Sequence, residues 1–350
     1  MKIRTVQLLL SPILFPVAVL YGLISRLRNL LFDAKILKSV SFEPFVICVG
    51  NLKAGGAGKT PFVKFLIESL VNEYSLATLS RGYKRTTKGF LMASKSTLAT
   101  EIGDEPMMYY TSYSDVVAVA VGEDRVIAIP NILQQKPDTK IVIMDDAFQH
   151  RYVKPDYAIL VADYNYLFTS DYMLPLGMLR EPRSGAKRAD VIVVSKCPAD
   201  LKSAEKERIE LEIRNYCKPS TVIYFTTIVE ENEVGESIDS RPVIVFSGIA
   251  QNDQFEFQLT QKYEVVDSLF YPDHHWYTVQ DIECLRALYE IHKENNPVIV
   301  TTEKDFVRLQ TKELKDALEG LPLCFVPIKV KFMEGETTFL ESLKNKISEK

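Results

Sequence analysis

The sequence has no paired cysteines and little net charge. Its five cysteines are scattered singly, without a CxxC pair, so we expect neither a disulfide framework nor a zinc site. The thiols are expected to be reduced, as in a cytosolic protein. The formal net charge is −4, which gives no indication of nucleic-acid binding. No internal repeat or low-complexity segment is present. The 350 residues therefore predict ordinary globular packing, with room for two domains.

The N-terminal segment departs from this soluble composition. Apolar residues dominate from Leu8 to Ile24, about 17 residues, which is the lower limit for crossing a hydrocarbon core ~30 Å thick. Pro12 and Pro16 would kink a helix there, and no small-residue cleavage site follows. We predict a helix that lies in, or inserts shallowly into, a membrane surface; a true span and a buried soluble helix are the alternatives.

The charge of residues 1–40 is consistent with an anionic surface as a partner. Only Asp33 is acidic in this segment. The basic residues are Lys2, Arg4, Arg26, Arg28, Lys35 and Lys38.

Beyond residue 44, short β-branched runs alternate with helical segments. Strand-like runs occupy residues 44–50, 75–82, 115–121, 140–146, 157–163, 190–196 and 221–228, and a helix is expected at 60–74. Continuous apolar strands with helices between them indicate a mostly parallel α/β sheet covered on both faces.

A polar, acidic stretch at 229–242 is the best candidate for a linker. A smaller α/β unit follows it, with strand-like runs at 243–250, 263–275, 297–305 and 323–332 and a helix near 279–294.

The stretch VGNLKAGGAGKTPFV (residues 49–63) predicts a phosphate-binding loop. The standard spacing, G-x-x-x-x-G-K-[ST], requires glycine where this chain has Lys53. The loop can still surround phosphate oxygens with backbone N–H groups at a helix N-terminus. Lys59 can reach the β- and γ-phosphates, and the Thr60 hydroxyl can bind Mg²⁺. The expected nucleotide-binding residues are Gly55, Gly56, Ala57, Gly58, Lys59, Thr60 and Pro61. A chance glycine-rich turn between a strand and a helix is the alternative.

A magnesium–nucleotide site also needs a carboxylate at the end of a neighbouring strand. IVIMDDAFQH supplies Asp145 and Asp146, and strand alternation predicts that only one of them reaches the metal directly. A solvated turn is the alternative. Pro198 stands where a guanine-specific motif would have aspartate, so ATP is favoured over GTP.

Several further stretches are too unusual for a generic nucleotide-binding domain. They are SRGYKR (80–85), GDEP (103–106), DDAFQH (145–150), LPLGMLREP (174–182), YPDHHWY (271–277) and TTEKDFVRL (301–309). In this order, with the glycine loop and the apolar N-terminus, the chain resembles the tetraacyldisaccharide 4'-kinase family from about residue 1 to 310. It departs from the family at Ala147, where glycine is usual. The irregular glycine spacing is itself shared by the family.

The resemblance implies a function and a location. The family uses ATP and Mg²⁺ to phosphorylate the 4'-hydroxyl of a tetraacyldisaccharide 1-phosphate, a lipid A precursor. It acts at the cytoplasmic face of the bacterial inner membrane. We therefore predict three parts: a membrane-associated segment (1–40), a P-loop kinase domain (41–235) and a smaller C-terminal α/β domain (236–350). The resemblance leaves the oligomeric state open.

The resemblance also implies roles for individual residues. Lys59 and Thr60 match the loop lysine and the Mg²⁺-binding hydroxyl. Asp104 matches a catalytic carboxylate that works with His274, with His275 as the alternative. Glu105 matches a metal-site acid. Asp145 and Asp146 match the strand-end acidic pair, and Asp146 also matches a catalytic residue. Gln149 matches a nucleotide-site residue. The residues that would line the lipid head group or the phosphates are Arg81, Tyr83, Arg125 and Arg180.

The chemistry of the reaction agrees with these roles. A sugar hydroxyl must lose its proton as the phosphoryl group is transferred, and a carboxylate can accept it, particularly if a histidine orients the carboxylate or receives the proton. Structural alternatives are a helix N-cap for Asp104, a packed histidine pair, and a surface ion pair for Arg180. The competing functions are a membrane-associated P-loop ATPase switch and a membrane protein with a decayed site.

Overall fold

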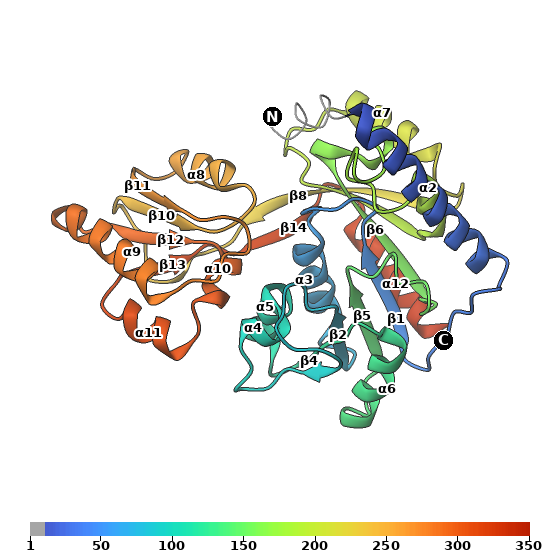
Figure 1. Cartoon of the computed structure of the whole chain (residues 1–350), viewed down its shortest axis with the longest axis horizontal. Coiled ribbons are helices and arrows are strands. Elements are labelled where there is room, and N and C mark those ends of the chain that lie inside the picture. The colour runs from blue at the N-terminus through green and yellow to red at the C-terminus, as the bar shows by residue number, and fades with distance from the viewer. Residues whose placement is uncertain (1–10) are drawn as a thin grey trace. The chain divides into compact units, whose positions relative to one another are not determined.

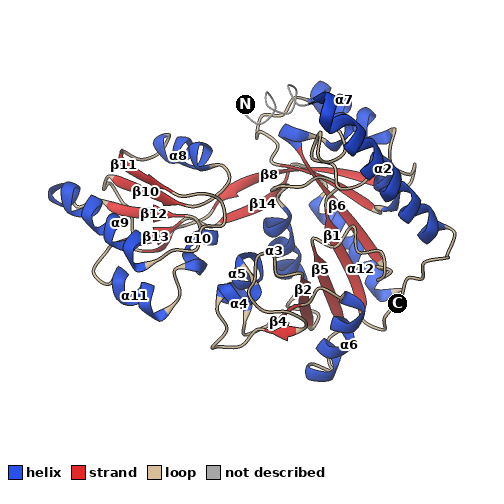
Figure 2. Cartoon of the chain, in the orientation of Figure 1, coloured by secondary structure: helices blue, strands red, loops and turns tan. Residues whose placement is uncertain are grey.

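The computed structural model describes residues 11–350, so the first ten residues of the predicted membrane segment lie outside the described part. The chain packs as two compact units. Unit 1 comprises residues 1–81, 115–229 and 330–350, and unit 2 comprises residues 82–114 and 230–329. In each unit the strands form a sheet with helices alongside it (Figure 2).

Unit 1 contains a large sheet in which the strands from β8 to β4 pair in parallel. Eight neighbouring strands of this sheet run in the order β14-β8-β7-β6-β1-β5-β2-β4. They are β14 (Ile328–Phe332), β8 (Val222–Glu230), β7 (Val191–Ser195), β6 (Tyr157–Asp163), β1 (Phe45–Gly50), β5 (Ile141–Asp145), β2 (Leu76–Ser80) and β4 (Val117–Val121). The central strand β1 is buried throughout, as the continuous apolar run FVICVG predicts. It pairs in parallel with β5 and β6, which brings the ends of β1 and β5 to the same edge.

Unit 1 also contains helices between and beyond these strands, and together they give the predicted α/β class (Figure 1). They are α2 (Ser11–Asp33), α3 (Lys59–Leu70), α6 (Arg125–Gln135), α7 (Ser203–Arg214) and α12 (Glu336–Ser348), with short 3-10 turns at Tyr164–Tyr166, Phe168–Ser170 and Arg183–Arg188. The mostly parallel sheet confirms the predicted fold class.

Unit 2 is built around a smaller sheet with the strand order β11-β10-β12-β13-β9. Its strands are β11 (Val265–Phe270), β10 (Val243–Ser247), β12 (Val298–Thr301), β13 (Leu323–Phe325) and β9 (Val234–Gly235). Its helices are α8 (Asn252–Thr260), α9 (Val279–His292), α10 (Glu303–Arg308), α11 (Lys312–Leu318) and the short turn Lys293–Asn295. The segment 82–114 adds β3 (Leu91–Met92), α4 (Ala99–Ile102) and α5 (Asp104–Tyr113).

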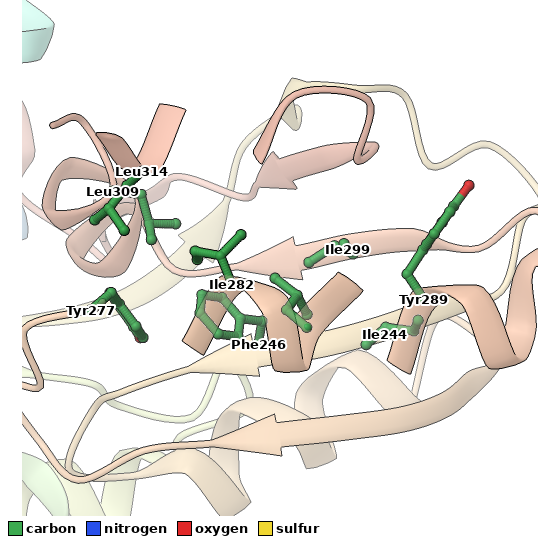
Figure 3. Packing of buried hydrophobic residues seen from close by; sticks show 9 residues of the cluster. Ile244, Phe246, Tyr277, Ile282, Tyr289, Ile299, Leu309 and Leu314 are labelled. Carbon is green, nitrogen blue, oxygen red and sulfur yellow. The ribbon is translucent and has the colours of Figure 1, made fainter. Parts of the chain in front are cut away.

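One face of this smaller sheet carries a compact hydrophobic core (Figure 3). Ile244 and Phe246 of β10 and Ile299 of β12 pack against Ile282 and Tyr289 of α9. Tyr277, Leu285, Leu309 and Leu314 complete the cluster. The core includes Tyr277, in the loop between β11 and α9 that carries His274, and Leu309, which directly follows α10.

The division into units differs from the contiguous domains expected from the sequence. Residues 82–114 pack with unit 2 because α5 lies against α10, where Asp104 contacts Arg308 and Ser112 donates to Glu303 at 3.3 Å. The expected linker contains β9, whose pairing with β13 is antiparallel.

The C-terminal segment also differs from expectation. The run at 323–332 forms two strands instead of one: β13 ends before Pro327, and β14 joins the large sheet. Residues 330–350 return to unit 1, where Phe339 packs edge-on against Phe62 and Tyr224. These aromatic contacts bury apolar surface of the C-terminal helix α12 and so stabilise its packing in unit 1.

Candidate active site

The glycine loop between β1 and α3, here called the phosphate loop (residues 51–58), has the conformation that a phosphate cradle needs. Gly55 and Gly58 have positive φ angles of 109° and 83°, which side-chain-bearing residues rarely adopt. A Cβ on Gly55 or Gly56 would meet no atom within 4 Å, so this face of the loop has room for a ligand. A Cβ on Gly58 would meet the Ser195 hydroxyl at 2.9 Å, so glycine is required there.

The loop carbonyls are held from the end of β7. The Ser195 hydroxyl donates to the carbonyl of Ala57 at 2.5 Å, and the Lys196 ammonium donates to the carbonyl of Gly56. Lys196 is itself held by Asp163 at 2.9 Å. Since the carbonyls are tied on one side, the amide groups of the loop are fixed in direction.

Lys53 occupies the position at which the standard motif has glycine, and the structure explains why. Its ammonium pairs with Asp171 at 2.6 Å, and its backbone bridges to Leu179. Position 53 therefore belongs to a bridge between two loops, and the phosphate cradle begins after it.

Lys59 and Thr60 open helix α3, directly after the cradle. The Lys59 ammonium lies 3.4 Å from Asp146. Asp145 is the last residue of β5 and is buried, whereas Asp146 follows in a left-handed turn with φ 49°. The predicted strand alternation thus ends at Asp145, and Asp146 reaches the lysine through the turn.

Arg180 grips the same carboxylate with both ends of its guanidinium group. The two nitrogens lie 2.9 and 2.7 Å from the oxygens of Asp146, and one of them also contacts the Asn51 side chain. Burial by itself would raise the pKa of Asp146, but the hydrogen bonds and charges of Arg180 and Lys59 outweigh it and hold this pKa well below its usual range. The Asp146 carboxylate is therefore ionised, as a magnesium-binding group must be.

Gln149 links two loops next to the cradle. Its amide donates to the carbonyl of Asn51 at 2.8 Å and to Glu181 at 2.9 Å. Glu181 is also held by Arg188 at 2.8 Å. The structure thus places Gln149 directly behind the phosphate loop, where it fixes the start of that loop.

The predicted substrate residues divide between the units. Arg81, Arg125 and Arg180 belong to unit 1, and Tyr83 belongs to unit 2. Arg125 is buried and donates to the carbonyl of Glu123 at 2.9 Å. Burial and the neighbouring charge of Arg81 lower its pKa to about 10, so these arginines concentrate positive charge in one region.

Unit 2 brings together a second group of residues, here called the acid–histidine cluster: Asp104, His274, Lys304 and Arg308. Nδ1 of His274 lies 2.9 Å from Oδ2 of Asp104. The Arg308 guanidinium contacts the same oxygen, and the Lys304 ammonium lies 3.6 Å from it. Asp104 is the first residue of α5, and Gly103 is its N-cap, so the N-cap alternative for Asp104 does not hold.

The charge state of Asp104 follows from these neighbours. Burial would raise its pKa, but the hydrogen bond with His274 and the charges of Lys304 and Arg308 hold the pKa well below the ordinary range. Asp104 is therefore a carboxylate at neutral pH, although its side chain is only 3% exposed.

The two adjacent histidines have different surroundings. His274 has a positive φ of 62°, which turns its ring toward Asp104, and the ring of Tyr83 packs edge-on against it at 5.2 Å. His275 instead stacks on Tyr271 at 4.5 Å and lies 3.0 Å from Asp281 in the first turn of α9. The geometry therefore joins His274, and not His275, to Asp104.

The structure also adds residues that the sequence reasoning did not assign. Lys304 and Arg308 lie within the stretch TTEKDFVRL, and Lys304 approaches Nε2 of His274 at 3.4 Å. Asn51 is the third. The available signal was the set of charged residues in that stretch, but only tertiary packing shows that two of them face Asp104.

The expected metal-site residues do not all lie together. Thr60, Asp145 and Asp146 belong to unit 1, whereas Glu105 belongs to unit 2. Among residues 11–350, no group of three or more His, Cys, Asp or Glu residues could hold a metal ion. The hydroxyl and carboxylate oxygens of unit 1 are nevertheless the hard ligands that suit Mg²⁺ bound jointly with a nucleotide's phosphates.

Helix α2 is connected to this site and presents apolar side chains to the outside. Its Tyr21 hydroxyl donates to the carbonyl of Arg180 at 2.8 Å, and Arg28 donates to the carbonyl of Gln149 at 3.2 Å. Pro12–Asp33 is apolar and long enough to cross a membrane by length and composition, and only 6% of its most apolar stretch is buried. The buried-helix alternative is therefore wrong, and the helix continues through Pro16 without interruption.

A cavity of about 440 Å³ lies between α2 and the segment 171–184. Phe15, Val19 and Leu23 of α2 line it on one side, and Met173 and Leu176 line it on the other. Arg26 and Arg183 also contribute to its wall.

These observations define a class of protein first. The parallel α/β sheet, the phosphate loop with its lysine and the strand-end carboxylates are those of a P-loop nucleotide-binding protein. The chain belongs to the tetraacyldisaccharide-1-P 4'-kinase (LpxK) family, whose model matches residues 10–348. The resemblance noted from the sequence is thus confirmed.

Curated relatives and a solved structure agree with this assignment. The chain is 42% identical over 349 residues to the tetraacyldisaccharide 4'-kinase of Flavobacterium johnsoniae, covering 97% of this chain and 98% of the relative. It is 37% identical over 334 residues to that of Bacteroides thetaiotaomicron, covering 89% and 87%. The crystal structure of "apo" form LpxK from Aquifex aeolicus in complex with ATP matches with a TM-score of 0.76 and 28% identity, over 98% of this chain and 99% of that one.

Proposed function

We propose that this protein transfers the γ-phosphate of ATP to the 4'-hydroxyl of a tetraacyldisaccharide 1-phosphate, a step of lipid A biosynthesis. Membership of the family over nearly the whole chain carries this proposal. The phosphate loop and the acid–histidine cluster support it, because a kinase needs both a nucleotide site and a group that accepts the hydroxyl proton.

Unit 1 supplies the nucleotide half of the reaction. The amide groups of the phosphate loop and the N-terminus of α3 bind the phosphates, and Lys59 neutralises charge on the group being transferred. Thr60, Asp145 and Asp146 would hold Mg²⁺, which would neutralise charge on the β- and γ-phosphate oxygens. Arg180 keeps the Asp146 carboxylate oriented and ionised.

Unit 2 supplies the acceptor half. The pair formed by Asp104 and His274 accepts the proton of the 4'-hydroxyl as the new bond to phosphorus forms. The ring of Tyr83 fixes one side of the His274 ring. Most of the acceleration comes from positioning and charge stabilisation, as in other phosphoryl transfers.

The acceptor is an amphiphile, and helix α2 has the surface to meet it in a membrane. The side chains of Leu20, Ile24 and Leu27 are each about 60% exposed. Arg26 and the basic residues flanking the helix can contact anionic lipid head groups, each contributing about 1 kcal/mol. The inner membrane's cytoplasmic face is the surface we assign to this helix.

The cavity beside α2 supports the same substrate. Its walls are mainly apolar, and Arg26 and Arg183 place positive charge within them. An acyl chain fits the apolar part of such a cavity, while an anionic head group suits the arginines. Arg81 and Arg125 add positive charge in the same unit and are assigned to the acceptor's head group.

The test is a phosphate-transfer assay with ATP, Mg²⁺ and a monophosphorylated acylated disaccharide, read by mass spectrometry. The expected product is heavier by one phosphate, located at the 4'-position. ATP hydrolysis at the same rate without the lipid would instead indicate an ATPase switch. The absence of any nucleotide-induced rise in melting temperature would indicate a decayed site.

A further inference from the structure

A continuous chain of hydrogen-bonded side chains runs through unit 2 and ends at the acid–histidine cluster. The Tyr277 hydroxyl donates to Asp305 at 2.9 Å, and Arg308 donates to the same Asp305 oxygen at 2.8 Å. The other end of the Arg308 guanidinium contacts Asp104, which lies 2.9 Å from Nδ1 of His274. Tyr277 belongs to the hydrophobic core of Figure 3, so the chain starts from a buried side chain of that core.

Arg308 and Asp305 are completely buried, which makes the arrangement costly unless every charge is paired. Arg308 is paired with two carboxylates and also donates to the carbonyl of Gly248 at 2.9 Å. The same carbonyl accepts the backbone N–H of His274 at 3.2 Å, and the N–H of Gly248 donates to Asp305 at 3.1 Å. The guanidinium thus fixes both the Asp104 carboxylate and the backbone that carries His274.

The contacts of the His274 ring define its tautomer. Nδ1 lies 2.9 Å from Oδ2 of Asp104, the oxygen that also accepts from the Arg308 guanidinium, so this oxygen is an acceptor and the proton of the bond is on Nδ1. Nε2 lies 3.4 Å from the Lys304 ammonium, which can only donate, and 3.7 Å from the Asp273 carboxylate, so its nearer neighbour matches a lone pair on Nε2. Arg308 lies 3.4 Å from Nδ1, farther than Oδ2 of Asp104 at 2.9 Å, so the shorter contact with the carboxylate decides which nitrogen carries the proton.

Oδ2 of Asp104 is surrounded by groups that donate to it or carry positive charge: His274, Lys304 and Arg308. Its other oxygen, Oδ1, accepts the backbone N–H of Glu105 at 2.9 Å. Both oxygens are therefore engaged, and the carboxylate is better placed to orient the histidine than to receive a proton from the acceptor.

We infer that Arg308 is a positioning residue for phosphoryl transfer. It holds Asp104 so that His274 keeps its proton on Nδ1 and offers Nε2 to the acceptor hydroxyl. This inference rests on the proposed function. In the step it describes, the O–H bond of the 4'-hydroxyl breaks and its proton passes to Nε2. The oxygen forms the bond to the γ-phosphorus, and the bond from that phosphorus to the ADP oxygen breaks.

The Lys304 ammonium must move away from Nε2 of His274 before the acceptor hydroxyl can approach this nitrogen. Its side chain is 22% exposed and it also lies 3.5 Å from the exposed Asp273, so it has an alternative partner when a hydroxyl approaches Nε2. The charged groups that face the His274 ring are Asp104 from α5, Lys304 and Arg308 from α10, and Asp273 from its own loop.

The tautomer can be measured without any activity. The chain has four histidines, so long-range ¹H–¹⁵N correlation spectra of the ¹⁵N-histidine-labelled full chain in detergent show four rings, and His274→Gln identifies the one of interest. At pH 8 the wild-type protein should show the Nδ1–H form of His274. An Nε2–H form in the wild-type protein would overturn the inference, whatever the variants do.

Kinetics of the Arg308 variants test the positioning role. Arg308→Met should lower kcat about 100-fold, the effect of a displacement of roughly 1 Å in a catalytic group. The KM for ATP should stay within about 2-fold, because the loop that binds ATP is in unit 1. Arg308→Lys keeps the charge but loses the two-ended contact, so it should recover part of kcat, to within about 10-fold of wild type. In Arg308→Met the His274 ring should also show an Nε2–H population.

Arg286→Lys is the matched control, since Arg286 also anchors two carbonyls in unit 2, those of Ala317 and Glu319 at 2.6 and 2.8 Å. It should change thermal stability without changing kcat or the tautomer. If Arg308→Met does not fold, Arg308→Lys and the wild-type tautomer still decide the question. Folded Arg308 variants with wild-type kcat and an unchanged tautomer would contradict the inference. An inactive wild-type protein with the expected tautomer would instead count against the proposed function alone.

Discussion

The carboxylates beside the phosphate loop and in the acid–histidine cluster differ in how far they are buried and in how their charge is compensated. Beside the phosphate loop, Asp146 lies between Lys59 and Arg180 and is 37% exposed, so this carboxylate is partly open to solvent. In the cluster, Asp104 is 3% exposed and is held by Arg308, which is fully buried. In the proposed function, the first site neutralises the charge of the nucleotide's phosphates, whereas the second keeps one carboxylate fixed beside the histidine that accepts the proton.

The comparison also separates two routes to a functional site. The phosphate loop is assembled from neighbours in the sequence, with a few outside residues such as Ser195 and Arg180 that hold it in shape. The cluster is assembled from residues 104, 274, 304 and 308, which only the folding of unit 2 brings together.

The largest effect is expected at the phosphate loop. Lys59→Ala should lower phosphate transfer by about 10³-fold or more, because charge clamps on the transferring group are worth ~10³–10⁵ in rate. Stopped assays with labelled ATP would measure this loss, and a melting curve should show that the fold persists. Lys344→Ala is the matched control, since it removes a lysine–carboxylate pair of the same unit, with Glu73 at 2.5 Å. Turnover of Lys59→Ala within about 10-fold of wild type would refute the assignment of the loop.

The acid–histidine cluster should show a smaller, coupled effect. Asp104→Ala and His274→Ala should each lower kcat by about 10²–10⁴-fold, the range of general acid–base catalysis. The double variant should lose far less than the product of the two, since the pair acts as a unit. Fully multiplicative losses in a double-mutant cycle would separate the two residues.

His275→Ala is the control for that cycle. It removes the stacking on Tyr271 and the contact with Asp281, so it should lower the melting temperature while kcat stays near wild type. A greater loss of kcat in His275→Ala than in His274→Ala would mean that the structural pairing with Asp104 is not the catalytic one.

The N-terminal helix offers a third effect, on membrane binding. Leu20→Ser, Ile24→Ser and Leu27→Ser together should weaken binding to anionic vesicles by at least ~10²-fold, because each apolar side chain is worth about 1.5–3 kcal/mol when fully buried. Vesicle sedimentation measures this. The KM for ATP should be unchanged, since these side chains are exposed and the contacts of α2 with the phosphate-loop region come from Tyr21 and Arg28.

Deleting the whole helix would be a less selective test than the sequence suggests. The sequence places the glycine loop beyond residues 1–28, which predicts an intact ATP site after deletion. The contacts of Tyr21 with Arg180 and of Arg28 with Gln149 show that α2 supports that site. If the triple serine variant still sediments fully with vesicles, the membrane contact lies elsewhere.

The smallest effect is expected at Ser195, which anchors a carbonyl of the phosphate loop. Ser195→Ala removes one hydrogen bond to the carbonyl of Ala57, worth about 1 kcal/mol, so the KM for ATP should rise about 5-fold with little change in kcat. Isothermal titration with a non-hydrolysable ATP analogue would check it independently. Unchanged affinity would show that the loop keeps its conformation without this anchor.

The sequence determined much of unit 1 by itself. Continuous apolar runs such as FVICVG can be satisfied only inside a sheet covered on both faces, so the strands were predictable within a residue or two. Phosphate binding by Gly-Lys-Thr after such a strand was predictable because the lysine and the helix N-terminus are adjacent in the chain. The apolar helix was predictable because its run of apolar residues departs from the composition of the rest of the chain.

Only the tertiary structure decided what the remaining residues do. Strand alternation predicted opposite directions for Asp145 and Asp146, but the left-handed turn at Asp146 and its contact with Arg180 place it beside Lys59. The segment 82–114 joins unit 2 because Asp104 finds its charge partners there, and the run 323–332 is divided between two sheets. Partners this far apart in the chain leave no periodic pattern, since what pairs them is the burial of a charge that must be compensated.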